Sequence, residues 1–130
     1  EMARKTLENG GSTLMCKTAE DIENITAKSA VEAAENGDET AKEVYRICGE
    51  KLGEGLAILA DILDPQAIII GSIFARSGHL LKDSMEKALH REALSQTAGC
   101  RIIPAGLGEK IGDLASLGIA LDAAANGGKA

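Results

Sequence analysis

A proline-bounded apolar run most constrains what this chain can fold into. Asp64 and Pro65 end a long helical pattern, because the residue before a proline is displaced from the α-helical region. Three isoleucines, Ile68–Ile70, follow and lead directly into Gly71 and Ser72. A short run of consecutive β-branched residues is typical of a strand covered on both faces. We therefore predict a parallel strand that stops abruptly on two small residues.

The pattern on either side of this run is mostly helical. Helices are predicted over residues 1–9, 25–36, 39–63, 77–94 and 114–125, and a second strand over residues 100–104. Gly37 is expected to end one helix in the left-handed conformation, and Asp38 to cap the next. Residues 1–130 thus form a single α/β segment, helix-rich with about two parallel strands. Two strands cannot bury both faces unaided, so we expect pairing with another chain, or further strands outside this sequence.

The long helix at residues 39–63 contains an unusual set of glycines. Gly49, Gly53 and Gly55 fall within two turns, and each costs about 1 kcal/mol relative to alanine in a helix interior. Two explanations stay open at this point. The glycines allow the helix to pack closely on the sheet, or they leave backbone clearance beside a ligand.

Composition excludes several classes of function. The chain carries 14 Lys and Arg against 20 Asp and Glu, and its only aromatic residues are Tyr45 and Phe74. A nucleic-acid interface through this segment is not expected, because it needs a basic face. No apolar run approaches the roughly 18 residues of a membrane span. Three widely spaced cysteines, Cys16, Cys48 and Cys100, predict reduced thiols in a cytoplasmic protein.

A search for catalytic or metal-binding residues identifies none. His79 and His90 lie eleven positions apart on one predicted helix, so they cannot share a metal, and we expect both to be exposed. The glutamates fall largely on exposed helix faces. The remaining candidates are Gly71 and Ser72, since ligands of open α/β sheets bind beyond the carboxyl ends of strands. From the residues alone, both a ligand contact and an ordinary strand-to-helix turn stay open there.

The order of these segments resembles the carboxy-terminal half of the ROK family, whose name joins repressors, open reading frames and sugar kinases. The family pattern is a helix ending in Gly-Asp, an alanine a few residues on, a glycine-bearing helix, Leu-Asp-Pro, an apolar strand and a Gly-Gly turn. The matching positions are Gly37-Asp38, Ala41, Gly49 with Gly53, Leu63-Asp64-Pro65, Ala67 to Ile70, and Gly71-Ser72. The closing run IIPAGLGEKIGDLASLGIALDAA is also similar. Ser72 replaces the second glycine of the turn, and Ile119 stands where the family prefers alanine.

The resemblance implies the actin-like, ribonuclease-H-like sugar kinase fold. ATP with Mg²⁺ would lie between two lobes and a sugar in the cleft, with Gly71 and Ser72 beside the adenosine and its inner phosphate. The family's catalytic aspartate, phosphate loops and zinc-binding segment would all precede Glu1. Residues 1–130 would then be a carboxy-terminal fragment of the large lobe, inactive alone.

Three functions follow from this interpretation. The leading one is the carboxy-terminal part of a glucokinase-like, ATP-dependent sugar kinase that phosphorylates a hexose hydroxyl. The second is the same part of a sugar-responsive transcriptional repressor, whose helix-turn-helix would lie upstream. The third is a non-catalytic interaction module that pairs through its small-residue helices. In each case we expect the segment to form a homo-oligomer, because sheet edge and apolar helix faces need cover.

Overall fold

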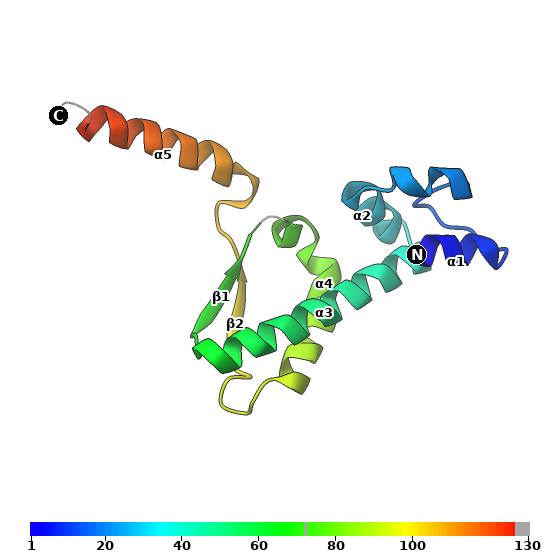
Figure 1. Cartoon of the computed structure of the whole chain (residues 1–130), viewed down its shortest axis with the longest axis horizontal. Coiled ribbons are helices and arrows are strands. Elements are labelled where there is room, and N and C mark those ends of the chain that lie inside the picture. The colour runs from blue at the N-terminus through cyan, green and yellow to red at the C-terminus, as the bar shows by residue number, and fades with distance from the viewer. Residues whose placement is uncertain (72, 127–130) are drawn as a thin grey trace.

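The computed structural model describes residues 1–71 and 73–126, which form an elongated arrangement with the first two helices at one end of the long third helix and a small sheet near its other end (Figure 1). The helices are α1 (Met2–Glu8), α2 (Ala27–Glu35), α3 (Glu39–Leu63), α4 (Ile73–Glu92) and α5 (Ile111–Asn126), with short 3₁₀ helices at Ala19–Asn24 and Gly108–Lys110. The strands are β1 (Ala67–Ile70) and β2 (Arg101–Pro104). None of the helices described is long and apolar enough to cross a membrane.

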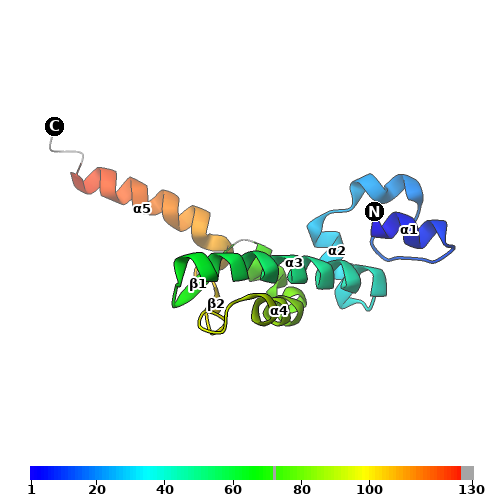
Figure 2. The same ribbon diagram turned by 60° about the horizontal axis from the view of Figure 1, so that its bottom comes forward.

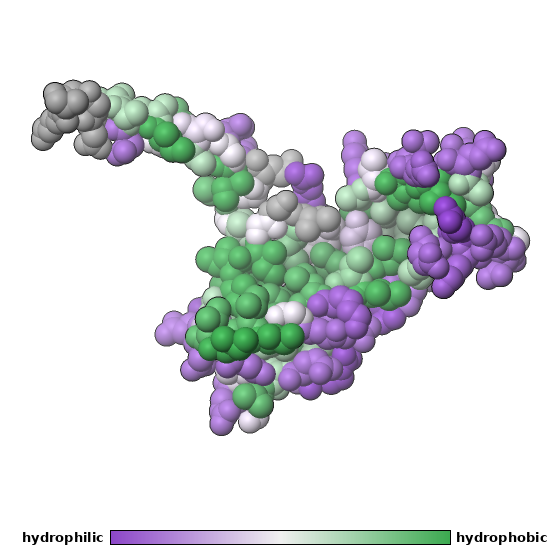
Figure 3. All heavy atoms as spheres, in the orientation of Figure 1, coloured by the Kyte–Doolittle hydropathy of each residue, from purple (hydrophilic) through white to green (hydrophobic). Residues whose placement is uncertain are grey.

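The two strands pair in parallel, as predicted. Ala67 lies opposite Arg101 and Ile70 opposite Pro104. Ile68 packs against the core, but the side chain of Ile69, on the other face, is 70% exposed. Figure 3 shows a continuous apolar area over the end of α3 and the strands. The described elements therefore cover the strand on one face only, as expected of two strands that cannot bury both faces unaided, and cover on the second face stays a prediction.

Helices α3 and α4 pack against each other at two glycines of α3. A Cβ atom at Gly49 would lie 2.5 Å from the carbonyl oxygen of Leu81, and one at Gly53 would lie 2.2 Å from that of Met85. Both distances are far below van der Waals contact. Gly49 and Gly53 thus permit close contact between two helices, rather than the helix-on-sheet packing or the ligand clearance that the sequence suggested. Around Gly55 there is open space, so it has no part in this contact.

Helix α3 begins at a carboxylate that also binds a distant loop. Gly37 has φ of +92°, and the Oδ1 atom of Asp38 accepts a hydrogen bond from the Ala41 amide at 2.8 Å, so the predicted stop and cap are confirmed. Oδ2 of Asp38 accepts hydrogen bonds from the Thr13 hydroxyl, at 2.7 Å, and from the Leu14 amide. Burial opposes ionisation, but these hydrogen bonds outweigh it and lower the pKa of Asp38.

Two predicted helix starts are corrected. Helix α4 begins at Ile73 rather than at Ser77, and Ser77 instead forms a kink with φ of −122° and ψ of 15°. The extra turn forms because the Phe74 amide donates to the carbonyl of Gly71 at 3.2 Å, and because the Phe74 side chain is buried. Helix α5 begins at Ile111, three residues before the predicted start.

Replacing Gly53 by alanine should destabilise the chain. We expect a loss of about 1–3 kcal/mol in the free energy of unfolding, because the added methyl group cannot fit beside the Met85 carbonyl. Gly55→Ala is the matched control on the same helix, and we expect it to stabilise by about 1 kcal/mol through helix propensity. Urea unfolding followed by circular dichroism measures both changes. Similar effects of the two substitutions would contradict the close contact.

Replacing Asp38 by asparagine should remove a pH dependence of stability. Because the folded-state pKa is lowered, ionised Asp38 stabilises the fold above the ordinary aspartate pKa of about 3.9. That stabilisation is lost as the pH falls below this value and through the lowered pKa. Urea unfolding between pH 7 and pH 3 should show a smaller loss for Asp38→Asn than for the unmodified chain. Asp83→Asn, at an exposed position on α4, is the control, and an Asp38→Asn profile identical to its profile would contradict the assignment.

Candidate functional site

The carboxyl ends of β1 and β2 lie at the same edge of the sheet. Gly71 follows β1 and Ala105 follows β2, and the Ala105 amide donates a hydrogen bond to the Ile70 carbonyl at 2.9 Å. From this edge the chain continues into α4 on one side and towards α5 on the other (Figure 1). This is the position at which open α/β sheets bind ligands.

Gly71 has few close neighbours among the described residues. A Cβ atom there would meet only the Cβ of Ala105, at 3.8 Å, which is ordinary van der Waals contact. Its φ is not in the left-handed region. Among the described residues, neither packing nor backbone conformation requires glycine at this position. Contact between Gly71 and a ligand stays a prediction, and Ser72, its predicted partner, lies outside the described residues.

The first turn of α4 is fixed beside this edge by buried polar groups. Ser77, at the kink, is fully buried and forms a hydrogen bond with Tyr45 of α3. The Tyr45 hydroxyl also donates to the carbonyl of Ala27 at 3.2 Å. Burial raises the pKa of Tyr45, and the hydrogen bond with Ser77 opposes that change. The tyrosine therefore stays protonated. Its hydroxyl connects α2, α3 and α4 near the kink, and α4 follows β1 at the carboxyl edge of the sheet.

A groove of about 340 Å³ begins near the edge and runs between α4 and β2. Its lining residues are Phe74, Gly78, His79, Lys82, Met85, Glu86, Ile102 and Pro104. His79 and His90 are both exposed, as predicted, and His79 Nε2 lies 3.1 Å from Glu35 Oε1. The 3.6-residue period places positions 74, 78, 82 and 85 on one side of α4. The helical period could therefore have predicted the residues that α4 contributes to the groove. It could not have predicted that β2 forms the other side.

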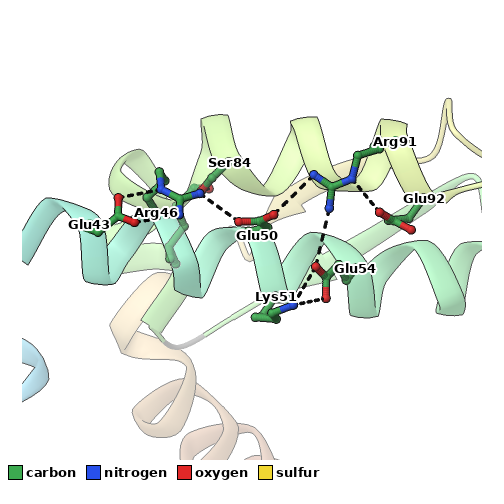
Figure 4. Close-up of polar contacts among 9 residues, drawn as sticks. Glu43, Arg46, Glu50, Lys51, Glu54, Ser84, Arg91 and Glu92 are labelled. Atoms are coloured by element: carbon green, nitrogen blue, oxygen red, sulfur yellow. Dashed lines mark hydrogen bonds and ion pairs between the residues drawn. The ribbon is translucent and has the colours of Figure 1, made fainter. Parts of the chain in front are cut away.

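Glu43, Glu50 and Glu54 of α3 belong to a cluster of ion pairs that joins α3 to α4 (Figure 4). Arg46 Nε lies 2.7 Å from Glu43 Oε2, and Arg46 Nη1 lies 2.9 Å from Glu50 Oε2. Arg91 of α4 reaches Glu50 at 3.4 Å and Glu54 at 3.6 Å. Hydrogen bonds from Arg46 lower the pKa of Glu43 and of Glu50. Glu43 and Glu50 therefore remain ionised near neutral pH.

Within residues 1–71 and 73–126, no group of three or more His, Cys, Asp or Glu side chains is arranged to hold a metal ion. Cys16, Cys48 and Cys100 are free thiols. Burial, followed by the nearby carboxylates of Asp21 and Asp38, raises the pKa of Cys16 and disfavours a reactive thiolate.

Comparison with known proteins identifies a family. The model of the ROK family matches residues 7–122. The DNA-binding transcriptional dual regulator NagC of Escherichia coli is 30% identical over 73 residues, which cover 56% of this chain and 18% of NagC. The chain therefore spans less than a fifth of this relative.

Two solved structures have a similar fold. A ROK family glucokinase from Streptomyces griseus, in complex with glucose and AMPPNP, matches with a TM-score of 0.70 and 31% identity, over 84% of this chain and 35% of that chain. A ROK family transcriptional regulator, a homolog of E. coli MLC protein, matches with a TM-score of 0.65 and 21% identity, over 78% of this chain and 25% of that chain. One backbone arrangement therefore occurs in both a kinase and a regulator.

Proposed function

Because the chain belongs to the ROK family, we propose that it is the carboxy-terminal part of the large lobe of an ATP-dependent sugar kinase. The proposed reaction transfers the γ-phosphoryl group of ATP to a hexose hydroxyl. The observation that carries the proposal is the likeness to the glucokinase, which covers most of this chain at 31% identity. The chain has the fold of part of an actin-like, ribonuclease-H-like sugar kinase.

The proposed contribution of this segment is to position the nucleotide. Phosphoryl transfer is accelerated mainly by positioning and by stabilisation of charge, so a lobe that contributes no reacting group still contributes to the rate. Gly71 presents a backbone without a side chain at the carboxyl edge of the sheet, and among the described residues a Cβ atom there would meet only the Cβ of Ala105. Gly71 and Ser72 would contact the nucleotide there, and Mg²⁺ would bind together with the phosphates of ATP.

A sugar-responsive transcriptional repressor is the second candidate. It is supported by the likeness to NagC, a DNA-binding regulator, and to a regulator of known structure with the same fold. In that case the segment would belong to the sugar-binding body of the protein, and DNA would be bound elsewhere. We place either protein in the cytoplasm, on the basis of the three free cysteines.

Sugar-dependent release of ADP distinguishes the two candidates. The polypeptide that contains residues 1–130 is incubated with Mg²⁺-ATP and a panel of hexoses that includes glucose and N-acetylglucosamine. For a kinase, we expect ADP release that depends on one of these sugars, measured with a coupled assay. The absence of release, combined with binding to promoter DNA that a sugar relieves in a gel-shift assay, would contradict the kinase and support the repressor.

Replacing Gly71 by valine should weaken ATP binding. We expect the Kd for ATP, measured by calorimetry on the polypeptide that contains residues 1–130, to rise about tenfold or more, because the side chain fills the space proposed for adenosine. Gly99→Val is the matched control, since Gly99 is equally open but precedes β2, at the opposite edge of the sheet. Equal affinity of the two variants would remove Gly71 from the nucleotide site without bearing on the kinase reaction.

A further inference from the structure

The kink divides helix α4 into two parts with different supports. The part after Ser77 is held on α3 by the close contacts at Gly49 and Gly53. The part before Ser77 is a single turn, residues 73–76, which begins two residues after Gly71 at the carboxyl edge of the sheet. Because the longer part is fixed on α3, the direction of the first turn relative to it is set at the kink.

A buried hydrogen bond holds the kink. Ser77 is fully buried, and its φ of −122° and ψ of 15° lie outside the helical region. Its hydroxyl forms a hydrogen bond with the Tyr45 hydroxyl, which donates its own proton to the Ala27 carbonyl at 3.2 Å. A phenol has one proton, so Ser77 is the donor in the bond with Tyr45. Alanine at position 77 would remove this bond and favour a regular helix.

Helix α2 is joined to the same region from both of its ends. Ala27, whose carbonyl accepts the proton of Tyr45, is the first residue of α2, and Glu35 is the last. Glu35 Oε1 lies 3.1 Å from Nε2 of His79, two residues after the kink. The side chains of this pair are 51% and 54% exposed, so solvent weakens their interaction. The buried bond between Tyr45 and Ser77 is therefore the stronger support of the kink.

We propose that Tyr45 and Ser77 are positioning residues for the adenine nucleotide at the carboxyl edge of the sheet. The identity of this ligand rests on the proposed function, whereas the positioning of the edge rests on the contacts described above. Both side chains are buried, so they act through the first turn of α4 rather than by contact with the nucleotide. The Phe74 amide donates to the Gly71 carbonyl at 3.2 Å, and a displaced turn would therefore displace the backbone at Gly71.

Nucleotide affinity tests the positioning role. In the polypeptide that contains residues 1–130, Tyr45→Phe and Ser77→Ala should each raise the Kd for ATP, measured by calorimetry, about fivefold or more. The double variant should bind ATP no more weakly than Tyr45→Phe, since both substitutions remove the same bond. In the assay of ADP release, the KM for ATP should rise while the KM for the hexose stays unchanged. General destabilisation would not produce that difference.

Thr97→Val is the matched control for the two kink variants. Thr97 is also buried, and its hydroxyl donates a hydrogen bond to the carboxylate of Asp61. It precedes β2, however, at the opposite edge of the sheet. We therefore expect Thr97→Val to lower the free energy of unfolding, measured with urea, and to leave the Kd for ATP unchanged.

Amide hydrogen exchange tests the positioning without any nucleotide. The Phe74 and Ala105 amides are both hydrogen-bonded at the carboxyl edge of the sheet. The two kink variants should accelerate the exchange of these amides at least tenfold relative to Thr97→Val, measured by NMR. The amides of residues 81–89, on the part of α4 that is fixed on α3, should keep their protection.

The outcomes separate this proposal from the proposed function. An unchanged Kd for ATP in the kink variants, or unchanged exchange at the edge, would overturn the positioning role and leave the proposed function in place. Equal changes in Thr97→Val would overturn it as well. If the unmodified polypeptide binds no ATP but exchange at the edge is accelerated in the kink variants, the proposed function fails and the positioning of the edge stands.

Discussion

The close contact between α3 and α4 is the interaction on which the rest of the chain depends. Gly49 and Gly53 let the α4 backbone approach α3, and this brings Leu81, Met85 and the other apolar residues of α4 into the core. Figure 2 shows α4 and the two strands on the same side of α3. The ion pairs of Arg91 lie at the exposed margin of this contact and add little, because solvent-exposed pairs contribute about 0–1 kcal/mol each.

The position of the candidate nucleotide edge follows from this contact. Helix α4 lies on α3, its kink at Ser77 is held by Tyr45, and its first turn continues directly from the end of β1. The position of Gly71 therefore depends on the packing of α3 against α4, which lies away from the sheet edge. The groove between α4 and β2 has the same origin, because both of its walls are elements that the α3 and α4 pair supports.

The individual helices and strands could be predicted from the sequence more accurately than the contacts between distant elements. Helical period, the Gly37 stop, the Asp38 cap and the β-branched run identified the long helix and both strands, since these signals act over a few residues. The partner of Gly49 and Gly53 could not be predicted, because their contacts on α4 lie about thirty residues further along the chain. The same holds for Asp61, which accepts hydrogen bonds from the Leu94 amide at 3.0 Å and from the Thr97 hydroxyl. Of the candidate site, the position of Gly71 at the carboxyl edge was predicted correctly, whereas the groove beside it was not.

The carboxylate of Asp38 also holds together two segments that are distant in the sequence. It accepts hydrogen bonds from the Leu14 amide and from the Ala41 amide, so one side chain holds both a loop near the amino terminus and the first turn of α3. The two amides, 27 positions apart in the sequence, donate to different oxygens of the same carboxylate. Loss of this one carboxylate therefore removes a hydrogen bond from both segments at once.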